Sequence, residues 1–518
     1  MASSDTVISQ DLPDPTTTAK ATASPAGDSR RWFALVIIAL AQLMVVLDAS
    51  IVTIALPYAQ ADLDISDANR QWALTAYTLM FGGLLLLGGR MADYLGRRNM
   101  FLVGLVGFAA SSAMAGFAWD AMSFFAGRAL QGAFAAILAP AALSLITVTF
   151  IEQHERARAF AVYAAVSGGG AAIGLIAGGA LTEFFSWRWT LLVNTPIAII
   201  AAIGALALVV RDKPSPRTGG YDIPGAVTVT LGLVGLVYGF TKAAEDGWGS
   251  STTVLLFVAA AVLLAAFVTI ELRTTNPLLP LRIPGEINRG GAYLVAFITP
   301  TAMFAMFLFL SYYFQNILGN SPMRAGVLFL PFPIVVIISA GLTSSLLPRF
   351  GPRPLMMVGT ALGGVGFAYL AQLDSNSSWV SHVLPSEILI AFGMGLVFVA
   401  SQTVALHRIK AEDSGVASAL LNTSQQVGGS VGIALLSTIV AQAFSGHNGS
   451  EMTQDPTTGA MVPVDPAGFM DANIHSYDVA FYWGAGFMVL AFVVSMFMIR
   501  MNRHELGDEP QNAVAVAH

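Results

Sequence analysis

The sequence predicts an all-α membrane protein with about fourteen transmembrane helices. Only 11% of its 518 residues are charged and 55% are hydrophobic, whereas roughly a quarter of the residues of a soluble domain are charged. The hydrophobic residues come in blocks of about twenty, the length that an α-helix needs to cross a hydrocarbon core of ~30 Å. Lys and Arg gather in alternate loops between these blocks, as the positive-inside rule predicts for a correctly counted bundle.

The apolar blocks give the expected spans in chain order. The first block follows directly on Arg30 and Arg31, a basic pair of the kind that marks the cytoplasmic face. Residues 1–31 are rich in Ala, Ser, Thr, Asp and Pro, so we expect a disordered cytoplasmic tail and no signal peptide. The expected spans are residues 33–57, 72–91, 99–118, 122–149, 157–182, 189–210, 223–243, 253–271, 291–315, 323–346, 354–373, 384–407, 415–443 and 478–500.

The basic residues orient this bundle. With the N-terminus inside, most of the 25 Lys and Arg residues fall on the cytoplasmic side. The outer side receives Arg70, Arg188, Lys242 and Arg324, and Arg128 alone lies within a span. A miscounted helix would scramble this asymmetry, so we expect both termini in the cytoplasm.

A weak internal repeat divides the chain. The expected second helix ends in the basic turn from Gly89 to Arg98, and the tenth ends in a degraded copy of it from Leu347 to Arg353. Repeated halves with a site between them are a common transporter plan. The predicted organisation is a tail 1–31, a six-helix half 32–210, an inserted two-helix linker 211–285, a second six-helix half 286–500 and a tail 501–518.

The residue types exclude several classes of site. Because the chain has no Cys, it has neither disulfides nor thiolate metal ligands, and its seven His show no paired metal spacing. None of its Lys stands in a G-x-x-x-x-G-K-[ST] loop, so we expect no ATP and no other cofactor. A membrane enzyme such as an acyltransferase would need a nucleophile and a base at one membrane face. A sensor would carry a folded soluble appendage, and the sequence indicates neither.

Four motifs carry a family resemblance. The turn from Gly89 to Arg98 is similar to the G-x-x-x-D-x-x-G-R-R signature of the major facilitator superfamily, and Arg128-x-x-Gln131-Gly132 resembles its R-x-x-Q-G signature. Residues 47–57 and 187–196 resemble two regions of that superfamily's fourteen-helix drug:proton antiporters. The resemblance covers about residues 32–500 and implies a major facilitator fold, a monomer in the bacterial inner membrane, and proton-driven export.

Asp48 is the strongest candidate for the proton site. It precedes Pro57 in the first span, so at 1.5 Å per residue it lies ~13 Å below the expected outer end of its helix. No other span holds a deep acid, since Glu387 is placed close to an outer end. An ionised carboxylate at that depth costs several kcal/mol unless it is paired or hydrated, which suits a group that takes up a proton. The alternative is a structural Asp that is hydrogen-bonded to a neighbouring helix.

Arg128 lies at a similar depth in the fourth span, ~10 Å from its expected outer end. Gln131 and Gly132 share a helix face with it. Our hypothesis is that Arg128 acts on Asp48 directly or through water, favours the ionised carboxylate, and sets where the proton is released. The alternative is that Arg128 bonds backbone carbonyls and packs its helix.

The basic turn is a candidate conformational latch. The resemblance implies that Asp93 docks against the start of a helix in the other half and holds the outward-facing state, an interaction worth roughly 0.3–1 kcal/mol. Positive-inside anchoring explains the three Arg without any mechanism. The latch candidates are Gly89, Arg90, Asp93, Gly96, Arg97 and Arg98.

Small residues in the fifth span predict a close helix contact. Their pattern resembles the antiporter signature G-x-x-x-G-P-x-x-G-G, but Leu175 replaces the Pro and so removes a cue for a kink. The glycines concerned are Gly170, Gly174, Gly178 and Gly179.

The C-terminal half offers uncharged polar groups, and Pro331 and Pro333 are expected to interrupt its second helix. Amides beside apolar walls suit a lipophilic ligand, and they equally suit hydrogen bonds between helices. The possible substrate contacts are Gln402, Asn422, Gln425 and Gln426.

These features favour a proton-coupled exporter. Protonation of Asp48 from outside and its deprotonation inside would alternate with substrate binding as the two halves rock. The expected partners are a small lipophilic substrate, protons and membrane lipid, without nucleic acid. The alternative is a dedicated exporter of a single metabolite or lipid-like molecule.

Overall fold

The computed structural model describes residues 25–150, 152–209, 222–374, 377–409, 413–454, 461–503 and 505. Within this part of the chain the backbone is almost entirely helical. In it, 13 helices are long and apolar enough to cross a membrane. The predicted all-α membrane fold is therefore confirmed.

The helices fall into three groups along the chain. The N-terminal group consists of α1 (Pro25–Asp62), α2 (Trp72–Leu95), α3 (Arg97–Gly116), α4 (Ala121–Thr149), α5 (Gln153–Phe184), α6 (Trp189–Leu192) and α7 (Asn194–Leu208). The inserted pair is α8 (Ile223–Asp246) and α9 (Ser251–Arg273). The C-terminal group consists of α10 (Ile287–Tyr312), the π-helix η1 (Tyr313–Ile317), α11 (Pro322–Leu328), α12 (Pro331–Phe350), α13 (Pro352–Leu370), the π-helix η2 (Trp379–Val383), α14 (Leu384–Leu406), α15 (Ser414–Ser445) and α16 (Pro466–Met498).

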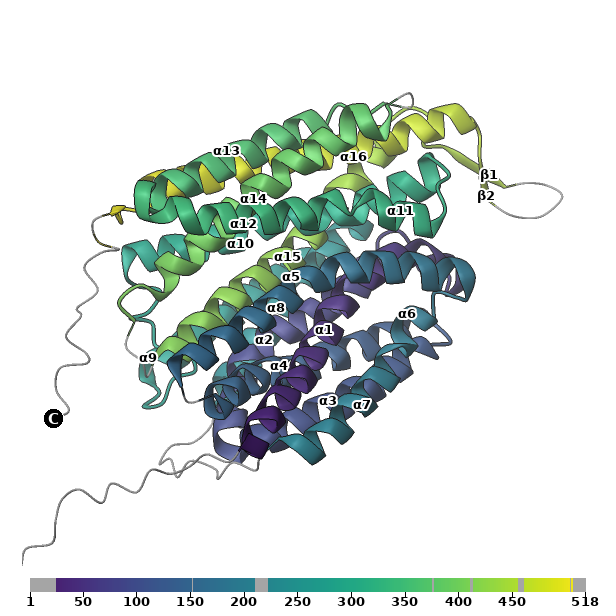
Figure 1. Ribbon diagram of the computed structural model, residues 1–518. Helices are drawn as coiled ribbons and strands as arrows, with labels where there is room; N and C mark the ends of the chain where they lie inside the picture. The colour runs from purple at the N-terminus through teal and green to yellow at the C-terminus, as the bar shows by residue number, and fades with distance from the viewer. Residues whose placement is uncertain are drawn as a thin grey trace, which may run out of the picture.

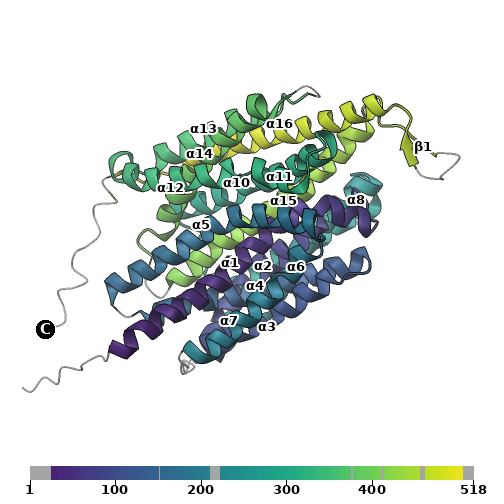
Figure 2. The ribbon, with the colours of Figure 1, turned by 45° about the vertical axis from the view of Figure 1, so that its right-hand side comes forward.

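The N-terminal and C-terminal groups form two bundles that lie side by side, with α5 and α15 between them (Figures 1 and 2). The inserted pair packs through α8 against α2 and α15. Helix α13 packs along α14 and α16 in the same orientation as the spanning helices, so it occupies the place of the predicted span 354–373. Its polar start at Pro352-Arg353-Pro354 makes it less apolar than its neighbours.

Several boundaries differ from the predicted ones. Helix α1 already begins at Pro25, so residues 25–31 of the predicted tail are helical, and residues 1–24 lie outside the described part. Helix α16 begins at Pro466, well before the predicted residue 478, because Asp465 caps it by accepting from the backbone N–H of Ala467. The start of the predicted linker, residues 211–221, lies outside the described residues, as does most of the predicted C-terminal tail 501–518.

Two predicted spans are broken helices. The tenth span divides into α11 and α12 just before Pro331, as its two prolines indicated. The sixth divides at Val193 into α6 and α7, a break that the sequence analysis did not predict. Between α15 and α16 the loop also forms a short antiparallel hairpin of β1 (Met452–Gln454) and β2 (Met461–Pro463).

The start of α4 is fixed by a capping box. Asp120 accepts a hydrogen bond from the N–H of Ser123 at 2.7 Å, while Ser123 Oγ accepts from the N–H of Asp120. The bonds from Ser123 lower the pKa of the Asp120 carboxyl, because they favour its ionised form. This reciprocal cap sets where α4 begins and thereby the height of Arg128 in the bundle.

The two ends of the molecule are packed differently. We call the end that carries Arg90, Arg97 and Arg98 the basic end, and the opposite end, where Asp62 lies, the acidic end. At the acidic end one hydrophobic cluster contains residues of both bundles, such as Leu56 of α1, which shares it with η1 and α11. Towards the basic end each bundle keeps its own cluster, and a smaller one joins α8 to α2 and α15.

Candidate functional site

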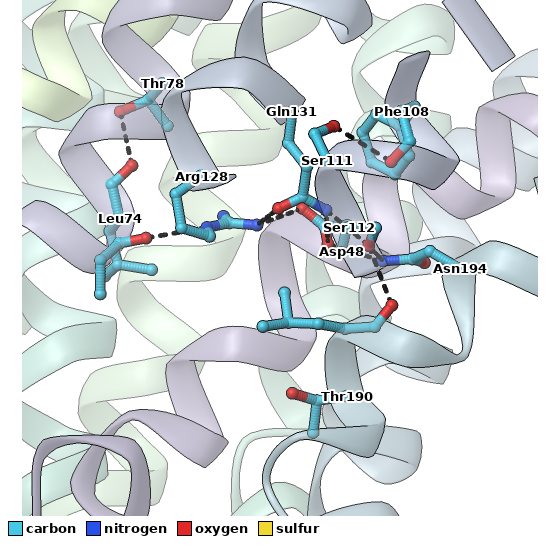
Figure 3. Close-up of polar contacts among 12 residues, drawn as sticks. Asp48, Leu74, Thr78, Phe108, Ser111, Ser112, Arg128, Gln131, Thr190 and Asn194 are labelled. Carbon is cyan, nitrogen blue, oxygen red and sulfur yellow. Dashed lines mark hydrogen bonds and ion pairs between the residues drawn. The ribbon is translucent and has the colours of Figure 1, made fainter. Parts of the chain in front are cut away.

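Asp48 and Arg128 form a buried ion pair in the N-terminal bundle. The two side chains come from α1 and α4, and both are 0% exposed. The Nη1 atom of Arg128 lies 2.6 Å from Oδ2 of Asp48 (Figure 3). The contact that matching depths suggested is therefore present, and it is direct.

Two amides complete the surroundings of the Asp48 carboxylate. Gln131 of α4 donates from Nε2 to Oδ1 of Asp48 at 3.0 Å, and Asn194 donates from Nδ2 to the same oxygen at 2.7 Å (Figure 3). Gln131 also accepts from Nη1 of Arg128 at 2.7 Å through its Oε1 atom. Because Asn194 is the first residue of α7, the break at Val193 brings this amide to the carboxylate.

Ser112 of α3 links the amides to the backbone. Its hydroxyl accepts from Gln131 at 2.8 Å and from Asn194 at 3.1 Å, and it donates to the carbonyl of Leu191 at 2.9 Å. Sequence reasoning missed Ser112 and noted Asn194 only as part of a motif. Their signal was weak, since single Ser and Asn residues in spans usually serve interhelical hydrogen bonds.

Arg128 is held on its other side by α2. Its Nε atom donates to the carbonyl of Ala73 at 2.9 Å, and its guanidinium lies 4.6 Å from the ring centroid of Tyr77. The alternative hypothesis, in which Arg128 bonds a backbone carbonyl, is therefore also met. A single guanidinium thus connects the Asp48 carboxylate to the first turn of α2.

The Asp48 carboxylate is surrounded by hydrogen-bond donors. Each side chain that contacts Asp48 does so with a donor: Nη1 of Arg128, Nε2 of Gln131 and Nδ2 of Asn194. A protonated carboxyl needs an acceptor for its own O–H, so a proton and these donors compete for the same oxygens. Beside them, Oδ1 of Asn194 is buried without a hydrogen-bond partner in the described structure.

The predicted glycines bring α1 and α5 together around Asp48. A Cβ atom at Gly174 would lie 3.0 Å from the carbonyl oxygen of Leu47, and one at Gly178 would lie 2.8 Å from that of Ile51. A Cβ at Gly170 would press on Val46 from 3.1 Å. The close contact therefore forms without the missing proline, and α5 continues unbroken from Gln153 to Phe184.

The other glycines of these motifs also allow close approaches. A Cβ at Gly132 would come within 2.1 Å of the carbonyl oxygen of Tyr77, so α4 needs glycine there to approach α2. A Cβ at Gly179 would lie 2.7 Å from the Cα of Met323, which belongs to the C-terminal bundle. Gly179 thus contributes to the contact between the bundles at the acidic end.

We expect Gly174→Ala to destabilise the protein by about 1–3 kcal/mol, because the new methyl group must push α5 away from the backbone of α1. The matched control is Gly169→Ala on the same helix, where a Cβ would meet nothing within 4 Å. That control should be neutral or slightly stabilising through helix propensity. Thermal unfolding in detergent measures both, and equal melting temperatures would contradict the contact.

The latch candidates lie around the turn between α2 and α3. Gly96 has a φ of 93°, which favours glycine. Arg90 donates to the carbonyl of Pro277 at 2.9 Å, after the inserted pair, and Arg98 donates to that of Leu206 in α7 at 2.7 Å. Gly89 makes an ordinary contact with α4. Arg97 is the first residue of α3. The side chain of Asp93 is outside the described part of the structure.

The possible substrate contacts do not form one cluster. Gln402 is exposed on α14. The other three, Asn422, Gln425 and Gln426, lie close together along α15. Asn422 is exposed and donates to the carbonyl of Ser418 at 3.2 Å, and Gln425 is half-buried. Gln426 packs beside Gly82 of α2, at the contact between the bundles.

Glu387 is a buried acid that depth alone did not reveal. It lies in the first turn of α14, at the acidic end of the molecule, yet it is 0% exposed. Both of its carboxylate oxygens are without a hydrogen-bond partner in the described part of the chain. Asp48 is therefore distinguished from Glu387 by its partners and not by its burial.

Comparisons with known proteins agree with this architecture. The family model described as Major Facilitator Superfamily matches residues 38–433. The puromycin resistance protein of Streptomyces alboniger is 44% identical over 489 residues, which cover 94% of each chain. The cephamycin export protein of Amycolatopsis lactamdurans is 38% identical over 80% of this chain and 86% of the relative, and a multidrug efflux pump of Mycolicibacterium smegmatis is 32% identical over 79% and 81%.

Solved structures share the fold at low sequence identity. A crystal structure of a peptide transporter, POT, has a TM-score of 0.62 at 13% identity and covers 89% of this chain and 93% of its own. A bacterial homolog of the human lysosomal transporter Spinster, crystallised in an inward-facing and occupied conformation, has a TM-score of 0.60 at 14% identity and covers 92% and 98%. The matched family model and relatives such as the puromycin resistance protein establish that the chain belongs to the major facilitator superfamily of membrane transporters.

Proposed function

We propose that this protein exports lipophilic small molecules in exchange for protons by alternating access. The observation that carries the proposal is the buried Asp48–Arg128 pair, whose hydrogen bonds compete with a proton. Three relatives support the direction of transport, since they are named for puromycin resistance, cephamycin export and multidrug efflux. Energy comes from the proton gradient, without ATP or a cofactor, and the working unit is a monomer.

In this proposal the basic end faces the cytoplasm, with both termini, and the acidic end faces outward. The shared hydrophobic cluster closes the acidic end, and the separate clusters let the bundles part at the basic end. Substrate enters from the cytoplasm while Asp48 is ionised and bound to Arg128. After the acidic end opens, a proton takes the place of the Arg128 contact on Asp48, and Arg128 keeps its bonds to Gln131 and Ala73.

The remaining motifs have supporting roles in the cycle. The latch residues around Gly96 hold the basic end closed in the outward-facing state, with Asp93 as the docking carboxylate. Arg90 ties this turn to the segment after α9, through the carbonyl of Pro277. The half-buried amides Gln425 and Gln426 contact substrate from the C-terminal half, which extends over residues 286–500.

Transport by everted membrane vesicles tests the proposal. With an acidic lumen, vesicles containing the protein should accumulate puromycin or a lipophilic fluorescent dye several-fold above vesicles without it. A protonophore should abolish the accumulation, because it removes the proton gradient. Accumulation that persists unchanged after the gradient has collapsed would show that transport is not coupled to protons.

The second candidate function is export of one dedicated metabolite or lipid-like molecule. The cephamycin export protein favours it, since its name records a single antibiotic. Competition distinguishes the two functions: a multidrug exporter is inhibited by chemically unrelated lipophilic compounds, whereas a dedicated one is inhibited only by analogues of its substrate.

A further inference from the structure

Arg70 is a buried cation at the contact between the two bundles. It lies in the turn between α1 and α2 at the acidic end, yet it is only 7% exposed. Its guanidinium lies 4.3 Å from the ring centroid of Tyr312, a residue of α10 in the other bundle. Its Nη1 atom pairs with Asp67 at 3.1 Å within its own bundle. Contacts between a cation and an aromatic ring strengthen when both partners are withdrawn from water, as they are here.

Tyr312 is held by a second group of the N-terminal bundle. Its hydroxyl donates to Oε1 of Gln60, and Gln60 donates in turn from Nε2 to Oδ1 of Asp67 at 2.8 Å. Asp67 thus positions both Gln60 and Arg70. We call these four residues the Arg70 clasp; Gln60, Asp67 and Arg70 belong to the N-terminal bundle and Tyr312 to the C-terminal bundle.

Neutral hydrogen bonds accompany the clasp at the same end. The hydroxyl of Ser311 donates to the carbonyl of Thr53 at 2.9 Å, and Gln315 donates to that of Ile54 at 3.1 Å. Water can replace a partner at these carbonyls when the bundles separate. Arg70 adds a cation–aromatic contact to Tyr312 that exists only while the two bundles are together, so the clasp also favours the closed end.

The clasp is also connected to the buried ion pair. The N–H of Ala73 donates to the carbonyl of Arg70 at 3.2 Å, and the carbonyl of Ala73 accepts from Nε of Arg128 at 2.9 Å. The first turn of α2 therefore lies between Arg70 and Arg128, and each of them binds the same residue of that turn.

We propose that Arg70 is a positioning residue of the transport cycle, which closes the acidic end on Tyr312 and transmits the state of Asp48 to that closure through Ala73. The closing role rests on the alternating access proposed above, and the link to Asp48 rests on its role in proton coupling.

Distance measurement between spin labels tests the closing role. The chain has no native Cys, so single cysteines can replace Trp119 and Val380, which are 76% and 66% exposed at the acidic ends of opposite bundles. The distance ratio is the population of molecules with the long distance divided by the population with the short distance. Arg70→Gln should raise this ratio about tenfold, as expected from the loss of a desolvated cation–aromatic contact. An unchanged distance distribution would overturn the proposal.

Arg188→Gln is the matched control. Arg188 also lies at the acidic end, pairs with Asp62 at 3.0 Å and stacks on Trp187 at 4.5 Å, but these partners belong to its own bundle. Arg188→Gln should therefore leave the distance ratio unchanged. Tyr312→Leu should reproduce Arg70→Gln, and the two changes together should not add, since they remove the same contact. A shift in the control equal to that in Arg70→Gln would show that the effect is unspecific.

A double-mutant comparison tests the link to Asp48. Asp48→Asn alone should change the distance ratio, that is, the ratio of the two populations. The same substitution made together with Arg70→Gln should change it by a factor that is at least about twofold smaller. Equal changes in both backgrounds would overturn the link and leave the closing role standing. Because the labels report conformation without transport, the result for the closing role does not depend on whether Asp48 carries the proton.

Discussion

We expect Asp48→Asn to abolish proton-driven export, with a loss of at least about 100-fold, while the protein still folds. The amide has nearly the shape of the carboxylate and still offers an oxygen to the donors of Gln131 and Asn194. It cannot take up a proton at any pH in the working range. Accumulation in vesicles under a proton gradient measures the loss.

Two controls separate loss of coupling from loss of binding. Exchange of labelled for unlabelled substrate across the vesicle membrane needs no net proton movement, so Asp48→Asn should retain it. Asp48→Glu keeps a titratable carboxyl and should retain part of the proton-driven export. If Asp48→Asn vesicles still accumulate substrate under the gradient, Asp48 is not the proton site.

We expect Arg128→Met to destabilise the protein by about 3–5 kcal/mol, because it removes one partner of a buried ion pair. The pair is 0% exposed on both sides, so removal of the cation leaves the Asp48 carboxylate buried without its charge partner. The carbonyl of Ala73 also loses its donor. Thermal or denaturant unfolding in detergent measures the loss of stability.

The double substitution Asp48→Asn with Arg128→Met should recover much of this stability, because it removes both charges of the pair. A second comparison is Arg188→Met, whose ion pair with Asp62 is 31% and 51% exposed, and which should cost at most about 1 kcal/mol. A double variant as unstable as Arg128→Met would show that Arg128 acts mainly through its other contacts.

Much of the fold follows from composition and spacing. Blocks of about twenty apolar residues predict helices, because only helices and closed barrels satisfy backbone hydrogen bonds in lipid. The same reasoning placed the break before Pro331, where the ring removes a helical hydrogen bond. It missed the break at Val193, although Pro196 three residues later lacks the N–H that would bond the carbonyl of Leu192, and it missed the early start of α16 at Pro466.

The candidate site was only partly predictable. Depth along a helix is countable, so Asp48 and Arg128 could be matched from residue numbers and a rise of 1.5 Å. Rotation about the helix axis and the choice of neighbouring helix are set by packing of the whole bundle, which one sequence does not reveal. The partners that depend on rotation, Ser112 and the carbonyl of Ala73, therefore became visible only in the structure.

The uneven division of the hydrophobic clusters has a consequence for hydrogen exchange. Two of the three main clusters belong to single bundles, so a rocking motion leaves their helices intact and their amides protected. The third spans both bundles, so in the proposed cycle it is divided each time the acidic end opens. Backbone amides at the acidic ends of α1, α5 and α10 lose their apolar cover in the open state, where local opening of the helix ends is easier, so they should exchange faster than those near the basic ends.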